Sequence, residues 1–283
     1  MSGFLRAFQG ELYLLSHRSS VRRAHLLVVV VAVLHVLGSM WLLQAEARLD
    51  DIRADTLAAW NFWPRWAAGS RAAMYFVELL VLALIAGSFP REISGGVVRD
   101  PATRGISRSA LMTARTLGAL LLPCSLYLTA AVAAFVPSWL LFDMGPVVED
   151  GDILLDELEI QEPVVLAMLH GFPAIVALGA FACLLSVVFQ RGVVASGVGL
   201  GVVFATGIFH ESLGDAAPLW FADTLAGFGP DSFLEQAAGF SQGLLDYYPE
   251  SFDAVVATGW WAPLPALFLS AYAALLVFRR RAL

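Results

Sequence analysis

Two ionisable side chains within long apolar stretches, Glu78 and His170, are the residues of this sequence best placed to do chemistry. Each lies about seven residues from one end of its stretch, which is roughly 10 Å deep at a rise of about 1.5 Å per residue. Ionisable residues at such a depth in a membrane are costly and often mark paths for ions or protons. A Glu78–His170 pair lining a cavity could therefore relay protons. The equal alternative is two unrelated groups, each hydrogen-bonded to its own neighbours.

The sequence lacks the patterns of several nucleotide- and metal-binding sites. It contains no lysine, and hence no phosphate-binding loop of the form G-x-x-x-x-G-K-[ST]. The stretch His210-Glu211-Ser212-Leu213-Gly214 lacks the second histidine of the zinc-protease pattern H-E-x-x-H. The histidines do not follow metal-ligand spacing. We therefore expect a non-enzymatic chain with no catalytic residue, metal or cofactor of its own.

The elements that must position these residues are predicted to be membrane-spanning helices. The chain is 59% hydrophobic and 14% charged, whereas a soluble domain is typically about 25% charged. Six apolar runs approach or exceed the length of about 20 residues that a spanning helix needs: 24–45, 71–90, 109–137, 164–189, 192–210 and 259–278. The sequence thus predicts an all-α membrane protein with a single transmembrane domain over residues 1–283.

Charge divides the segments between these runs into two groups. Twenty of the 24 acidic residues fall in 46–55, 143–162 and 211–253. Thirteen of the 17 arginines fall in the other group: Arg6, Arg18, Arg22, Arg23, Arg91, Arg99, Arg104, Arg108, Arg115, Arg191, Arg279, Arg280 and Arg281. Because basic loops of membrane proteins face the cytoplasm, both termini are predicted to be cytoplasmic and the protein to lie in the inner membrane.

Three further segments have predicted roles in this arrangement. Residues 1–23 are expected to form an amphipathic helix on the membrane surface, because apolar residues recur there at helical spacing. Residues 211–258 are expected to be an outer re-entrant or interfacial segment, since glycine and proline interrupt their apolar character. Gly197 and Gly201 have the small-xxx-small spacing that favours close helix packing, within the chain or between subunits.

The stretch FPREISGGVVRDPATRGISRSALMTAR, residues 89–115, separates the second and third apolar runs. It is long enough for a short helix parallel to the membrane. Its Arg104, Arg108 and Arg115 could pair with acids on a partner or with anionic lipid. The alternative is a solvated loop that these arginines anchor to lipid headgroups.

This loop resembles that of the permease subunits of ABC transporters of the second exporter type, which read roughly E-x-E-x-G-T, then P-V-S-R, then G-K. The matching positions are an acid, a glycine, a serine–arginine pair and a later basic residue: Glu92, Gly96, Ser107-Arg108 and Arg115. Three positions depart from the pattern: Ser94, Val97 and Gly105. The amphipathic start GELYLLSHR, the six spans and the chain length extend the resemblance over essentially the whole chain. It is closest to simple six-helix permeases such as that of nitrous oxide reductase maturation.

The resemblance implies that residues 91–108 form a cytoplasmic coupling helix seated on a separate ATPase subunit. The implied coupling residues are Glu92, Gly96, Arg99, Arg104, Arg108 and Arg115. It also implies a homodimer of this chain in membrane lipid with two copies of the ATPase, which would bind ATP and Mg²⁺. The complex would export a substrate or act mechanically on a periplasmic partner at the acidic outer loops, and no nucleic acid is expected.

Two other classes of function remain open from the sequence. The first is an ion-coupled secondary transporter that uses Glu78 and His170 as its relay and needs no ATPase. The second is a membrane enzyme, which ranks last because no catalytic constellation was recognised.

Overall fold

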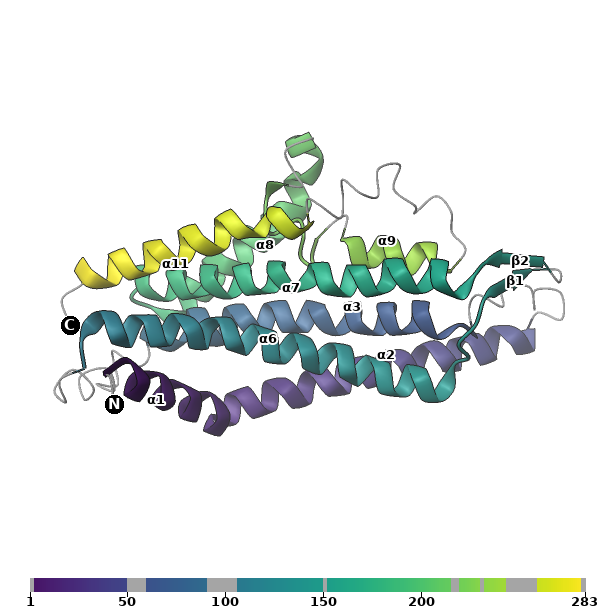
Figure 1. Cartoon of the computed structure of the whole chain (residues 1–283), viewed down its shortest axis with the longest axis horizontal. Coiled ribbons are helices and arrows are strands. Elements are labelled where there is room, and N and C mark those ends of the chain that lie inside the picture. The colour runs from purple at the N-terminus through teal and green to yellow at the C-terminus, as the bar shows by residue number, and fades with distance from the viewer. Residues whose placement is uncertain are drawn as a thin grey trace.

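The chain forms an elongated bundle of helices with a short β-hairpin at one end (Figure 1). The computed structural model describes residues 3–49, 60–90, 106–149, 152–214, 219–229, 232–242 and 259–280. Within these residues six helices are long and apolar enough to cross a membrane: Ser19–Ala45, Phe62–Pro90, Ser109–Leu141, Glu157–Val188, Gly192–His210 and Gly259–Arg280. The prediction of a helical, multi-pass membrane protein is therefore confirmed.

The first two helices are separated by a single residue. Helix α1 spans Gly3–His17 and helix α2 spans Ser19–Leu49, with Arg18 between them. Figure 1 shows α1, which meets α2 at a bend, at the end of the bundle where the last turn of α11 also lies; we call it the terminal end. The predicted surface helix over 1–23 thus ends at His17, and its place on a membrane surface stays a prediction.

Helix α3 (Phe62–Val81) begins nine residues before the predicted start at residue 71, so that boundary was wrong. Asn61 starts the helix, because its side-chain oxygen accepts a hydrogen bond from the N–H of Trp63 at 3.0 Å. Arg65 lies over the ring of Phe142 at 5.9 Å. The indole N–H of Trp66 donates a hydrogen bond to the carbonyl of Ala131 in α6 at 2.9 Å, so this first part of α3 packs against the region of α6.

A π-helical turn, η2 (Leu82–Ala86), continues this span towards Pro90. Ser196 donates a hydrogen bond to the carbonyl of Leu82 at 3.4 Å, which joins the turn to α8 (Gly192–Leu213). Gly199 lets the two elements approach closely, since a Cβ there would lie 2.8 Å from a methyl carbon of Leu82. Such close packing of small residues is common between membrane helices.

Helices α6 (Arg108–Leu141) and α7 (Glu157–Val188) form the middle of the bundle. The hairpin of β1 (Val147–Glu149) and β2 (Asp152–Leu155) connects them at the end opposite α1 (Figure 1). A reciprocal capping box starts α7, with Asp156 at the cap and Glu159 returning the bond. Helix α7 contacts α3, α6, α8, α11 (Pro263–Arg280) and the short α9 (Phe233–Phe240), so it is the central helix.

Candidate functional site

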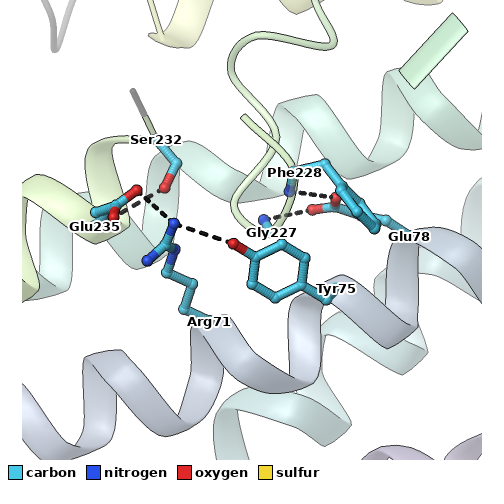
Figure 2. A network of polar contacts seen from close by, with 7 residues as sticks. All are labelled: Arg71, Tyr75, Glu78, Gly227, Phe228, Ser232 and Glu235. Atoms are coloured by element: carbon cyan, nitrogen blue, oxygen red, sulfur yellow. Dashed lines mark hydrogen bonds and ion pairs between the residues drawn. The ribbon is translucent and has the colours of Figure 1, made fainter. Parts of the chain in front are cut away.

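One face of α3 carries three polar side chains in the middle of a membrane-spanning helix. Arg71, Tyr75 and Glu78 are four and three residues apart, a spacing that places them on the same side of a helix. Figure 2 shows that all three point towards the segment that includes α9. We call that segment, residues 219–229 and 232–242, the docked segment.

Glu78 binds the backbone of the docked segment with both carboxylate oxygens. Its side chain accepts hydrogen bonds from the N–H of Gly227 at 2.7 Å and of Phe228 at 2.9 Å (Figure 2). The residue is 1% exposed. Non-helical backbone at membrane depth must have its polar groups satisfied by protein or water. The carboxylate satisfies two such groups, and two N–H donors compensate the burial of an acid.

Gly227 allows this approach because it has no side chain. A Cβ at this position would lie 2.6 Å from the backbone nitrogen of Tyr75 and 2.9 Å from the carbonyl carbon of Met74. The loop therefore rests directly on the backbone of α3. The rings of Tyr75 and Phe204 pack edge-on against Phe228, with centroids 4.9 and 5.2 Å away.

Arg71 fixes the other half of the docked segment. Its guanidinium forms an ion pair with Glu235 and donates a hydrogen bond to the hydroxyl of Tyr75 at 3.1 Å (Figure 2). Glu235 stands in the first turn of α9, where the hydroxyl of Ser232 accepts a bond from its N–H at 3.2 Å. The N-cap and the ion pair thus hold the start of α9 against α3.

Helix α8 also binds the docked segment through side chains. The ring nitrogen Nδ1 of His210 lies 2.8 Å from a carboxylate oxygen of Asp223. The indole N–H of Trp220 donates to the hydroxyl of Thr206 at 3.0 Å. Residues 211–258 were predicted to be re-entrant or interfacial, and the described part reaches Glu78, deep within the span Phe62–Pro90.

A cavity of about 260 Å³ lies beside the Arg71–Glu235 pair. Its polar lining consists of His35, Arg71, Tyr75, Glu235 and Gln242. Its volume falls just below the range of about 300–1,000 Å³ typical of small-molecule sites, and its main charges already pair with each other. The arrangement is therefore suited to holding the docked segment in place.

The structure gives Glu78 and His170 different partners. His170 is buried, and its Nδ1 lies 2.6 Å from the carbonyl oxygen of Leu166. Its ring packs edge-on against Phe233 and Trp260, with centroids 5.2 and 5.1 Å away. The histidine thus lies where α9 and the start of the last span meet α7.

Four of the six residues implied to couple to an ATPase lie outside the described residues: Glu92, Gly96, Arg99 and Arg104. Arg108 is the first residue of α6. Arg115 is only 8% exposed and binds within the chain, donating a bond to the hydroxyl of Ser88 at 2.5 Å. It also lies 3.9 Å from a carboxylate oxygen of Glu11. These contacts bind Arg115 within the chain, and its pairing with a partner's acid or with a lipid headgroup stays a prediction.

Gly197 and Gly201 lie on an exposed face of α8, where an added Cβ would meet no atom within 4 Å. Gly197 and Gly201 therefore provide no close packing among the described residues. Gly199, which lies between them in the sequence, provides it instead. Packing of this face between subunits stays a prediction.

One serine stands in a pattern that the sequence reasoning missed. Residues 239–243 read Gly-Phe-Ser-Gln-Gly, which matches the G-x-S-x-G of hydrolases. That pattern needs an exposed hydroxyl on a turn from strand to helix. Ser241 instead caps the carboxyl end of α9, is buried, and donates its hydroxyl to the carbonyl of Ala238 at 2.9 Å. Its geometry does not support a nucleophile.

Fold and site together define a multi-pass helical membrane protein with a segment docked by polar contacts among its spans. No protein-family model matches the chain, and a search of curated proteins returned no match. Among the described residues, no group of three or more His, Cys, Asp or Glu side chains could hold a metal ion.

Proposed function

We propose that this chain is the membrane-spanning permease subunit of an ABC transporter. It would work as a homodimer with two copies of a separate ATPase, and ATP hydrolysis would drive export of a substrate or movement of a periplasmic partner. The six spans and the pattern in residues 89–115 support the proposal. The observation that carries it is the contact that joins the two ends of the loop.

Residues on either side of the loop are bonded to each other. Ser88 precedes the loop and Arg115 follows it, and their side chains form a hydrogen bond. The guanidinium of Arg115 also lies 5.0 Å from the ring centroid of Phe89 and 3.9 Å from the carboxylate of Glu11 in α1. We call Ser88, Arg115 and Glu11 the loop-stem contact. A loop whose ends are fixed together moves its attached helices as a unit.

The loop-stem contact would pass a displacement of the loop into four elements. Ser88 lies near the end of the span that contains α3, Arg115 belongs to α6 and Glu11 to α1. Phe89 packs edge-on against Phe278 of α11, with ring centroids 5.4 Å apart. Packed side chains and ion pairs of this kind can carry coupling between distant parts of a protein. An ATPase that pushes on the loop would therefore move much of the terminal end.

The contacts of Glu78 weigh against the rival function of secondary transport. A proton-relay carboxylate must exchange its proton with water or with another titratable group. Both oxygens of Glu78 instead accept bonds from backbone N–H groups of the docked segment. We therefore infer that the Glu78 carboxylate holds the docked segment in place and does not carry protons.

The decisive variant reverses two loop arginines, Arg104→Glu and Arg108→Glu. If the partner surface is acidic, the reversal replaces attraction by repulsion. We expect the unaltered chain to co-purify with an ATPase that carries the Walker motifs. The variant should still insert and fold, but it should no longer co-purify with this ATPase or stimulate its ATP hydrolysis. The control is Glu149→Arg with Asp150→Arg, the same number of reversals in the acidic segment, which should change neither property. If the arginine variant still associates fully with the ATPase and supports full ATP hydrolysis, the loop only anchors the chain to lipid headgroups and the proposed coupling role is wrong.

A further inference from the structure

Two adjoining cavities lie under the bend between α1 and α2. The first, of about 390 Å³, is lined by residues of α1, the start of α2, the η2 region and α6. The second, of about 450 Å³, lies between α1, α2 and α6. Leu15, Val21 and Leu122 line both cavities. Both volumes fall in the range of about 300–1,000 Å³ that is typical of small-molecule sites.

The polar part of the lining of the first cavity has an excess of positive charge. Two arginines, Arg18 and Arg115, line it together with one acid, Glu11. Three hydroxyl groups complete the polar lining: Ser19, Ser20 and Ser88. Arginine forks and hydroxyls are the donors that bind phosphate oxygens most effectively.

The start of α2 also lines this cavity. Ser19 and Ser20 form the first turn of a 31-residue helix, and both line the cavity. The N-terminal end of a helix carries a partial positive charge and N–H groups that favour phosphate. Arg115 is nearly buried, so its charge acts with little screening by water.

The second cavity is mainly apolar. Four leucines line it: Leu12, Leu15, Leu121 and Leu122. The ring of His25 also lines it and already has partners, since its Nε2 lies 3.2 Å from the hydroxyl of Ser125 and its Nδ1 2.9 Å from the carbonyl oxygen of Val21. Water gains few hydrogen bonds among leucines, whereas a hydrocarbon chain fits there without loss.

A cavity with two arginines in its lining, beside a mainly apolar cavity, matches a molecule with a phosphate head and a hydrocarbon tail. We propose that the two cavities bind one anionic phospholipid, with its phosphate between Arg18 and Arg115 and an acyl chain along the leucines of the second cavity. The site lies at the arginine-rich terminal end, where anionic headgroups of the facing leaflet would be attracted. A soluble phosphate compound would leave the second cavity empty. The site does not depend on the proposed permease function.

The test uses the full-length chain purified in detergent, with bound lipid counted by native mass spectrometry. Added dioleoylphosphatidylglycerol should saturate at one tightly held molecule per chain. Arg18→Gln removes one charge-assisted contact, which predicts an affinity about tenfold lower or more. The matched control is Arg23→Gln, since Arg23 is an exposed arginine of α2 that lines neither cavity. Its affinity should equal that of the unaltered chain. Arg18 is preferred to Arg115, whose removal would also break the loop-stem contact.

Two further ligands test whether the site binds a lipid or a soluble phosphate compound, and whether the net charge of the headgroup matters. Glycerol 3-phosphate should bind far more weakly than the lipid, because it lacks the chain for the second cavity. Dioleoylphosphatidylcholine should also bind more weakly, because its ammonium group faces two arginines. The proposal is overturned if Arg18→Gln binds phosphatidylglycerol unchanged, if glycerol 3-phosphate binds as tightly as the lipid, or if the two lipids bind equally.

Discussion

A carboxylate in the middle of a helix bundle is tolerated only when donors surround its oxygens. Glu78 meets this condition with two backbone N–H groups from a loop that itself lacks regular hydrogen bonding at that depth. The acid and the loop therefore compensate each other. Arg71 and Arg115 follow the same rule, because each cation lies against an acid and a hydroxyl of another turn or helix.

Replacing Glu78 by leucine should destabilise the protein strongly. The substitution removes both acceptors and leaves the N–H groups of Gly227 and Phe228 buried, at a cost of about 1–3 kcal/mol each. The measurement is thermal unfolding of the purified chain in detergent. Glu78→Gln should lose less, since its amide oxygen can still accept one of the two bonds.

The control for this prediction is Glu162→Leu. Glu162 is an exposed acid in the same helix-rich chain, near the start of α7, and its replacement should leave the melting temperature nearly unchanged. Equal melting temperatures for Glu78→Leu and the unaltered chain would mean that the two hydrogen bonds contribute nothing to stability.

At the scale of elements, the docked segment is held by side chains of α3 on one side and α8 on the other. Irregular backbone is stable among spanning helices only when it is covered by protein. Here Glu78 and Arg71 bind it from α3, and His210 binds it from α8. Loss of close contact at any one of these places should loosen the whole segment.

Gly227→Ala is expected to displace the loop from α3. The new Cβ would lie 2.6 Å from the backbone nitrogen of Tyr75, and overpacking of this kind costs about 1–3 kcal/mol. We expect faster amide hydrogen exchange in residues 219–229 together with a lower melting temperature. The matched control is Gly207→Ala in α8, where a Cβ meets no atom within 4 Å and the helix gains up to about 1 kcal/mol. Unchanged exchange in Gly227→Ala would show that the loop does not rest on α3.

At the scale of the whole molecule, α1 and the end of α11 lie at the same end of the bundle, and the β-hairpin lies at the other (Figure 1). An even number of spans brings both termini to one side. Among the described residues, arginines of α1, of the start of α2 and of the last turn of α11 lie at the terminal end, and the acids Glu149 and Asp152 belong to the hairpin at the other end. Which end faces the cytoplasm stays a prediction.

Labelling with an impermeant thiol reagent in intact cells tests the direction of insertion. In a variant whose two native cysteines are replaced by alanine, new cysteines at Gly105 and Leu283 should be shielded. Those at Ile153 and Leu219 should react, because both positions are exposed at 65% and 71% and belong to the acidic group of segments. The reason for this orientation is the thirteen-to-four distribution of arginine. Reaction at Gly105 from outside would overturn it.

Local properties of the chain were sufficient to predict the six spans. Whether a run can cross a membrane depends on its length and apolar content, which are read directly from neighbouring residues. The same local view placed the start of the second span at residue 71, nine residues after the observed start of α3 at Phe62. It also missed the role of Gly199 and selected Gly197 and Gly201, because spacing on a helix does not say which face meets a neighbour.

The sequence by itself thus determined the number of spans, their approximate places and the two groups of connecting segments. Only the tertiary structure decided the partners of the polar side chains. The Glu78 side chain meets the N–H of a residue 149 positions later, and Arg71 meets a carboxylate 164 positions later. Composition and periodicity indicate which charged side chains will be buried at a cost in free energy. The group that compensates each buried charge depends on how distant segments of the chain pack.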